Sequence, residues 1–426
     1  MCAMNEMEAV GGRIMRDAQS GSLGVKTFFG FKELIFALFL TAGNFKADPR
    51  LEWLPVDFTL LMALATVVFV IKEFLKSGLR VPTSLPLLLG FFLLFLPSTL
   101  WTDWHSYAIV KTVRFFTLTL LATVAPLFLI RSRRDLRRFL AALALLGGVM
   151  AADALLFLLA GGEQLHRSLA ARLMIFSSST ITLGRAAGIS FLWMALLRPR
   201  GWAMSLLAFS SIGVLAIVIL GAGSRGPLLA TAAALFVTVV LFQWRKPSSI
   251  VRFAAVVIVG ALGVMWAYPM LPGGSLLRAE RFFSGEFGSS ELLRVQAYRV
   301  SWETIRENPL GIGLGGFAKR SDLWLGEARQ FPHNILLETL LEGGWLAGIY
   351  FAFLLVRACQ NVKCFTRKLT GVTEFRTLFA VLLFLLMNDM VSGELNDSKM
   401  LLAFVGLALG LREDTNDEGQ EYSKHL

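Results

Sequence analysis

Two short polar motifs in the second half of the chain could carry chemistry, and the first is a Gly-Ser-Arg-Gly-Pro turn. It contains Ser224 and Arg225, and Pro227 suits the first turn of the apolar helix that would follow. Amide groups at a helix start and a neighbouring guanidinium together form an anion site. We therefore expect Ser224 and Arg225 to bind an anion. An ordinary turn whose arginine reaches the lipid headgroups is the alternative.

The second motif is His333-Asn334, where an apolar stretch carrying Glu338 and Glu342 begins. The two carboxylates are four residues apart and share one side of a helix. Charged groups just inside a membrane span are costly, so they usually face a cavity or a partner. A histidine at this position can act as base, acid or hydrogen-bond donor near neutral pH. A histidine satisfied by a lipid phosphate or by Glu338 is the alternative.

Arg294 lies between these motifs, in a stretch from 289 to 308 that predicts an amphipathic helix. Pro309 ends this helix, and its apolar positions have helical spacing: Leu292, Leu293, Tyr298, Trp302 and Ile305. Neighbouring glutamates could pair with Arg294, as on any solvated helix surface. Gly311, Gly313 and Gly316 have the spacing of a dinucleotide-binding turn but follow a helix instead of a strand. We interpret them as a flexible loop that brings Arg294 and His333 together.

Arg185 is a further candidate for the anion site, and Asn388 and Asp389 are other polar groups within or near apolar stretches. The elements that must position all of these residues are membrane spans. Apolar residues make up 55% of the chain and charged residues only 17%, and the apolar stretches match the ~20 residues that cross a bilayer. Twelve spans are predicted, near 30–44, 57–74, 83–100, 111–130, 138–160, 176–197, 202–221, 226–243, 251–270, 334–356, 376–392 and 397–411.

The basic residues fall in alternate short loops, which predicts that those loops and both termini are cytoplasmic. This placement also explains the net charge of +11, so we expect no nucleic-acid partner. The predicted order is a cytoplasmic segment 1–29, nine transmembrane helices within 30–270, a periplasmic loop 271–333 with the amphipathic helix, three helices within 334–411, and a cytoplasmic tail 412–426.

The order of these motifs along the chain resembles that of the bacterial O-antigen ligase and polymerase superfamily. The motifs are the Gly-Ser-Arg-Gly-Pro turn, Arg294, the stretch Asn-Pro-Leu-Gly-Ile-Gly from 308, and His333-Asn334 followed by the two glutamates. The resemblance covers about residues 220–350 and is closest to the ligases. It implies an all-α polytopic membrane protein with a GT-C-like glycosyltransferase architecture, using neither metal nor cofactor. Such a ligase transfers polysaccharide from undecaprenyl diphosphate to the lipid A core oligosaccharide at the periplasmic face of the inner membrane.

The resemblance also implies roles for individual residues. Arg225 and Arg294 would bind the donor diphosphate, and His333 would position or deprotonate the acceptor hydroxyl. The expected substrate contacts, to diphosphate or acceptor, are Ser224, Asn334, Glu338 and Arg185; the last is assigned from its physical placement alone. Attack from the side opposite the diphosphate would invert the anomeric configuration.

Two other functions fit the same motifs. A polymerase of the same superfamily would join repeat units on the same lipid carrier, but the single long outer loop favours a ligase. A transporter of the lipid-linked glycan would use the arginines as a binding site. It would need polar groups on both halves of the membrane, and here they lie mostly on the outer half.

Overall fold

A computed structural model describes most of the chain between the two predicted cytoplasmic ends. The described residues are 30–45, 48–167, 173, 179–197, 201–244, 247–284, 289–320, 330–368 and 373–411. The predicted segments 1–29 and 412–426 lie outside them. Every regular element among the described residues is a helix, so the all-α prediction is confirmed.

The first half of the fold runs from α2 to α9. Its elements are α2 (Phe31–Thr41), η1 (Ala42–Phe45), η2 (Pro49–Leu51), α3 (Phe58–Lys76), α4 (Leu85–Leu93), η3 (Pro97–Leu100), α5 (Ser106–Arg114), the π-helical turn η4 (Phe115–Thr119), α6 (Leu120–Val124), α7 (Pro126–Leu129), α8 (Arg133–Arg167) and α9 (Thr180–Leu196). The second half comprises α10 (Trp202–Gly221), α11 (Arg225–Phe242), α12 (Pro247–Ala267), η5 (Tyr268–Met270), α13 (Gly273–Phe283), α14 (Ser289–Glu307), α15 (Phe317–Arg320), α16 (Ile335–Lys368), α17 (Thr373–Ser392) and α18 (Lys399–Gly410).

Within the described part of the chain, eight of these helical stretches are long and apolar enough to cross a membrane, and three shorter apolar helices accompany them. The protein is therefore a polytopic membrane protein. Each predicted span coincides with a helix, although α2, with 11 residues, is short for a crossing. The count of twelve spans thus stays a prediction.

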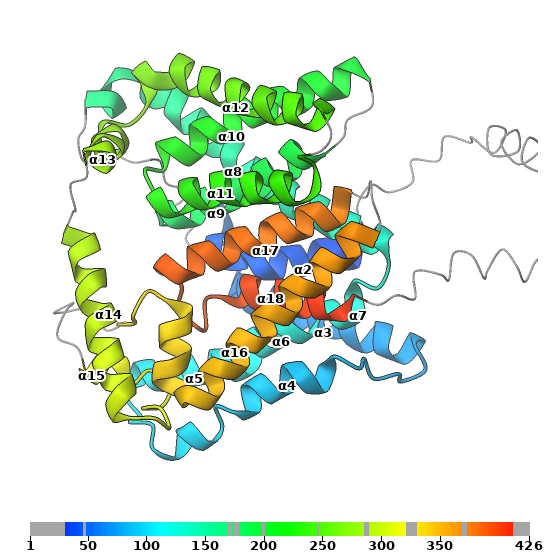
Figure 1. Ribbon diagram of the computed structural model, residues 1–426, viewed down its shortest axis with the longest axis vertical. Helices are drawn as coiled ribbons and strands as arrows, with labels where there is room; N and C mark the ends of the chain where they lie inside the picture. Colours follow the sequence, from blue (N-terminus) through cyan, green and yellow to red (C-terminus); the bar gives the residue numbers. More distant parts are fainter. Residues whose placement is uncertain are drawn as a thin grey trace, which may run out of the picture.

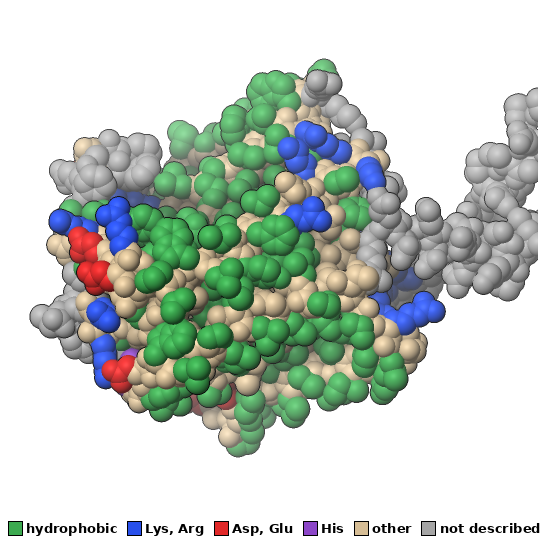
Figure 2. Space-filling model, turned by 60° about the horizontal axis from the view of Figure 1, so that its bottom comes forward, with side chains coloured by type: hydrophobic (Ala, Val, Ile, Leu, Met, Phe, Trp, Pro, Cys, Tyr) green, Lys and Arg blue, Asp and Glu red, His purple; other side chains and the backbone are tan. Residues whose placement is uncertain are grey.

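Burial differs between helices in the way a lipid-facing bundle requires. In α3 and α12 only 11% of the apolar window is buried, whereas in α17, which packs between α11, α16 and α9, the share is 67%. Phenylalanines fill the centre: the rings of Phe91 and Phe351 stack at 5.3 Å. Figure 2 shows apolar side chains over the middle of one face, with charged ones gathered toward its left and right ends. The apolar band is the surface expected to meet lipid.

The bundle has two distinct ends. Helices α13, α14 and α15 lie together at one end, on the left in Figure 1, which we call the α14 end. The opposite end, where α3 ends and α8 and α17 begin, carries basic side chains that include Lys76, Arg131 and Arg133, and we call it the basic end. Arg133 reaches Glu374 at the start of α17 at 3.5 Å, which confirms that these helix starts share one end.

A packed loop, instead of the flexible one expected from its glycines, leads from α14 to the membrane. The amides of Ile312 and Gly313 donate to Leu341 O and Glu342 O, at 2.9 and 3.1 Å. Gly311 has a φ of +85°, and a Cβ there would lie 2.5 Å from Glu342 O. The interpretation as a flexible loop was wrong because these glycines allow close backbone packing, which fixes the loop against α16.

Candidate functional site

Helix α14 places Arg294 at the edge of the bundle, and it buries a narrow face of its own. Ala297, Ser301 and Ile305, spaced four apart, are fully buried, and Ile305 packs in a small cluster with Phe317. Of the apolar residues named for the amphipathic helix, Ile305 is buried, whereas Leu292 is 55% exposed and Trp302 is 38% exposed. Small side chains on the buried side let α14 lie close to α16, while the larger apolar ones face outward.

His333 lies in the left-handed backbone region, with a φ of +60°. Few residues other than glycine adopt this conformation, which costs on the order of 1–3 kcal/mol and recurs at functional sites. Its ring packs on Phe331, with centroids 4.2 Å apart. Burial, and secondly the positive charge of Arg294, lower the pKa of His333 from 6.5 to about 4. The imidazole is therefore neutral at pH 7 and can accept a proton.

Arg294 is half-buried and lies close enough to act on the titration of both His333 and Tyr298. Arg299, one turn further on, is 82% exposed and pairs with Glu303 at 3.1 Å. By contrast, Arg294 forms no ion pair with any carboxylate in the described part of the chain. A guanidinium whose charge acts on a histidine, and which has no acidic partner among the described residues, is available for an anionic ligand.

Tyr298 and Asn334 attach this region to the membrane helices. The Tyr298 hydroxyl donates to Met390 O of α17 at 3.2 Å. Asn334 caps α16, because its Oδ1 accepts from the amides of Leu336 and Leu337 at 3.0 Å each. This cap fixes the residue that follows His333. Its predicted role as a substrate contact stays a prediction.

Arg225 is the first residue of α11, and Ser224 occupies the cap position without a side-chain hydrogen bond to the helix. The Arg225 guanidinium lies 3.4 Å from Glu291 Oε1 and donates to Arg278 O at 3.1 Å. Glu291 belongs to α14, three residues before Arg294. Helix α14 therefore brings the two predicted diphosphate-binding arginines to the same end of the molecule.

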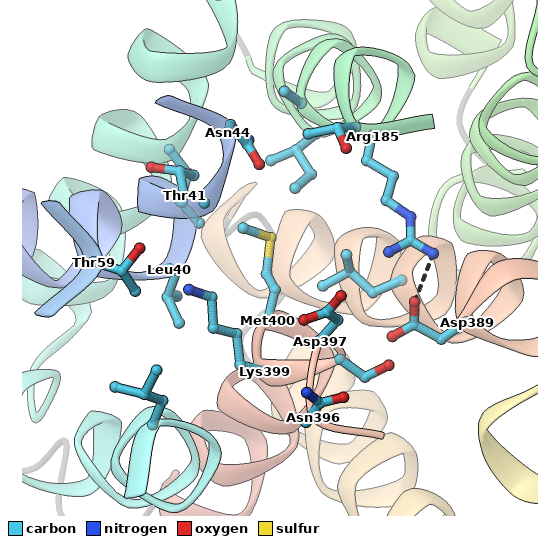
Figure 3. Close-up of a pocket in the computed structure, with 18 of the residues that line it drawn as sticks. Leu40, Thr41, Asn44, Thr59, Arg185, Asp389, Asn396, Asp397, Lys399 and Met400 are labelled. Atoms are coloured by element: carbon cyan, nitrogen blue, oxygen red, sulfur yellow. Dashed lines mark ion pairs between the residues drawn. The ribbon is translucent and has the colours of Figure 1, made fainter. Parts of the chain in front are cut away.

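Arg185 reaches this end from α9 and faces a cavity of about 560 Å³. Figure 3 shows its guanidinium directed at Asp389 of α17, which it meets at 2.8 Å, with Asp397 and Lys399 nearby in the same cavity. Arg185 also donates to Ser392 Oγ at 3.0 Å. Arg225, Arg294 and His333 do not line this cavity. The structure thus separates Arg185 from the other three candidates.

Close helix packing nevertheless links the two places. A Cβ on Gly184 would lie 2.9 Å from Pro227 Cβ, and one on Gly226 would lie 3.7 Å from Asn388 Oδ1. The residues beside Arg185, Arg225 and Asp389 therefore touch one another, so that α9, α11 and α17 converge at the α14 end.

Glu338 and Glu342 have a partner that sequence reasoning missed. Both are fully buried and both bind Lys111 of α5; Lys111 Nζ lies 2.6 Å from Glu342 Oε1. Glu338 Oε2 also accepts from the amide of Leu395, and Glu342 Oε1 from that of Gly315, each at 2.9 Å. The expectation that these carboxylates face a partner is confirmed. As a substrate contact, Glu338 stays a prediction.

Residues 210–352 match the family model described as O-antigen ligase. The match covers a domain-sized region, less than half of the chain, and makes that region similar to the O-antigen ligase family. A comparison with curated proteins found no match. The domain runs from α10 into α16 and contains Arg225, Arg294 and His333, whereas Arg185 lies before it. The resemblance inferred from the motifs is thereby confirmed.

The O-antigen ligase domain indicates a glycosyltransferase-like ligase or polymerase activity, with lipid-linked glycans and membrane lipids as partners in general. At the α14 end this region combines an arginine with no acidic partner in the part of the chain that the structure describes, a second arginine at a helix start and a neutral histidine. Such groups can stabilise a departing phosphate anion and accept a proton from a hydroxyl.

Proposed function

We propose that this protein is an O-antigen ligase, which transfers polysaccharide from undecaprenyl diphosphate to the lipid A core oligosaccharide. The observation that carries the proposal is that Arg294, which has no acidic partner among the described residues, lies close enough to lower the pKa of His333, and that both lie in the region similar to the O-antigen ligase family. The α14 end would face the periplasm of the inner membrane, and the basic end and both termini the cytoplasm. The positions of the basic loops support this orientation.

In the proposed reaction, His333 orients the acceptor hydroxyl and accepts its proton. The acceptor oxygen forms a bond to the anomeric carbon of the donor while the bond from that carbon to the diphosphate oxygen breaks. The bonding electrons leave with the diphosphate, and the anomeric configuration inverts. Negative charge grows on the leaving group, so contacts from Arg294 and Arg225 become stronger in the transition state. These cations would supply the stabilisation without a metal ion.

The neighbouring cavity would receive a polar part of one substrate. Arg185 would contact the diphosphate or the acceptor from there, held by Asp389 in its present position. Ser224 would add a hydroxyl contact at the start of α11. The lipid tail of the donor would lie against the apolar surface of the bundle.

The test is the lipopolysaccharide banding pattern of a ligase-deficient strain with a matched acceptor core. Wild-type protein should restore the polymer ladder, and Arg225→Ala, Arg294→Ala and His333→Ala should each lose it at normal membrane levels. Loss of one such contact commonly slows a reaction by about 10²–10³-fold. Arg299→Ala is the matched control on α14, and it should keep the ladder because its side chain is exposed and paired with Glu303.

The alternatives give different patterns. A ladder that persists in all three variants would refute the proposed site. If the knockout leaves single repeat units on the lipid A core, the protein is a polymerase, whereas free lipid-linked polymer indicates a ligase. Purified protein that binds the lipid carrier and forms no glycosidic bond with any acceptor would indicate a transporter.

A further inference from the structure

A second cavity lies at the basic end, on the side of the bundle opposite the proposed reaction site. Its volume is about 740 Å³, and it lies between the turn after α3, the connection from α7 to α8, and the last residues of α18. Four basic side chains line it, and none of its lining residues is acidic: the basic ones are Lys76, Arg80, Arg131 and Arg133. The cavity is therefore positively charged.

Two of these four cations are compensated by acids and two are not. Lys76 pairs with Glu73 at 3.0 Å, and Arg133 pairs with Glu374 at 3.5 Å. Arg80 and Arg131 form no ion pair with a carboxylate of the described chain; the Arg131 guanidinium lies 6.0 Å from the Phe128 ring. The tendency of basic residues to gather at one end explains their number. It does not explain why two unpaired arginines face one cavity.

The backbone that presents Arg80 is strained. After α3, Gly78 and Leu79 both lie in the left-handed region, at φ values of +63° and +60°. This conformation is rare for a branched side chain such as leucine. The two residues reverse the chain, so that Lys76 and Arg80 line the same cavity. Strained positions of this kind cluster at ligand-binding turns.

The floor of the cavity is apolar. Leu127, Ile130, Leu136, Phe365 and Phe375 line it and are all buried. Exposed apolar side chains, Leu75 and Val81, stand next to the basic rim. A free inorganic anion would use the rim alone, whereas a ligand with a phosphate group and an attached apolar part would use the rim and the floor together.

We propose that this cavity binds the phosphate headgroup of an anionic phospholipid. Arg80 and Arg131 contact the phosphate, and the glycerol and first methylene groups cover the apolar floor. Basic pockets between membrane helices bind lipid headgroups by the same combination of charge and depth. The site is independent of the reaction proposed above, because it lies at the other end of the bundle.

The experiment is native mass spectrometry of the full-length protein in detergent, titrated with phosphatidylglycerol, cardiolipin or zwitterionic phosphatidylethanolamine. Wild-type protein should retain the two anionic lipids in preference to the zwitterionic one. The variant R80Q/R131Q should lose about 25-fold in apparent affinity for them, since each arginine near an anionic headgroup contributes roughly fivefold. Neither side chain has an acidic partner among the residues that the structure describes, so the variant should fold normally.

The matched control is R357Q/R367Q, which removes the same charge from two exposed positions of α16 outside the cavity. Its apparent affinity for anionic lipids should stay within about twofold of wild type, if the cavity and not the overall charge of the protein determines lipid binding. Equal losses in the two double variants, or none in either, would overturn the proposal. Thermal-shift measurements with inorganic phosphate test whether the cavity binds a free anion instead of a lipid. Stabilisation as large as that by phosphatidylglycerol would identify a free-anion site and overturn the lipid assignment.

Discussion

His333 combines a lowered pKa with a backbone conformation that most side chains avoid. Glycine would adopt its φ of +60° with less strain, yet the position carries an imidazole. Burial and Arg294 together keep this imidazole neutral well below pH 7. The two features agree with a residue selected for proton transfer at some expense in stability.

The pH dependence of the reaction should report this environment. In the free enzyme His333 has a pKa of about 4, so kcat/KM should stay level down to about pH 4 instead of falling near 6.5. A bound diphosphate offsets the charge of Arg294 and should raise the pKa, so that kcat declines at a higher pH than kcat/KM. Rates of purified protein in proteoliposomes between pH 4 and 8 would check this.

Arg294→Gln provides the control for that profile. Removing the positive charge should shift the acid limb of kcat/KM upward, although burial still keeps the pKa below 6.5. An acid limb at pH 6.5 in both proteins would contradict the assigned environment. The stability of the fold should also depend on this pKa. Between about pH 6.5 and 4 the unfolded chain binds a proton at His333 that the folded protein does not, so the free energy of unfolding decreases as the pH falls through this range.

At the scale of elements, the buried Lys111 cluster joins α5 to α16. Replacing Lys111 by Met leaves two buried carboxylates without their cation, which should destabilise the fold by about 3–5 kcal/mol. Glu338→Gln should cost less, because Lys111 keeps Glu342 and the amide oxygen still accepts from Leu395. Thermal unfolding in detergent measures both. Equal losses would show that the ion pairs do not carry the stability of this junction.

Helix α16 is broken at Gly344, where the backbone leaves the helical conformation, and this break offers a second test of an element. Gly344 has a φ of +79°, and a Cβ there would lie 2.7 Å from Pro309 O. Gly344→Ala should therefore lower the unfolding temperature and the membrane level, at a cost of about 2 kcal/mol or more. Gly148→Ala in α8 meets nothing within 4 Å and should be neutral or stabilising by up to ~1 kcal/mol. Similar behaviour of the two variants would argue against the packed loop.

The elements that sequence reasoning predicted well are those with long apolar periodicity or clear end signals, such as α14 before Pro309. It failed where the three-dimensional environment, and not the residue type, determines which side chains are buried and which groups pair. Helical spacing marks Leu292, Trp302 and Ile305 as apolar positions, but it does not decide which of them face the bundle and which face outward. Lys111 was missed because it lies 227 residues from Glu338 in the chain, and nothing in a single sequence pairs such distant groups.

For the whole molecule, the open prediction is orientation. In a variant with Cys2, Cys359 and Cys364 replaced by Ser, Leu310→Cys marks the α14 end, where Leu310 is 73% exposed. Arg134→Cys marks the exposed basic end. A membrane-impermeant maleimide should label the first in cells with a permeabilised outer membrane, and the second only after lysis. The reverse pattern would place the proposed reaction site in the cytoplasm and exclude the ligase function.

The candidate site as a whole was half predictable. Arg225, Arg294 and His333 follow from motif order, and the structure gathers them at one end. The separation of Arg185 into a cavity of its own depends on its contact with Asp389 across two helices. Sequence alone gives neither the depth of a side chain in a span nor the helix that it faces.

The break at Gly344 divides α16 into a shorter piece, which neighbouring elements hold in place, and a longer piece that follows it. The Asn334 cap, the Lys111 ion pairs and the contacts to 312–315 all hold the nine residues before the break. One alanine inserted after Trp345 would turn the rest of α16 by about 100° about its axis and leave the shorter piece in place. Gly344 thus marks the point at which the loop grips both pieces of α16, because the amide of Trp345, just beyond the break, donates to Pro309 O at 3.0 Å.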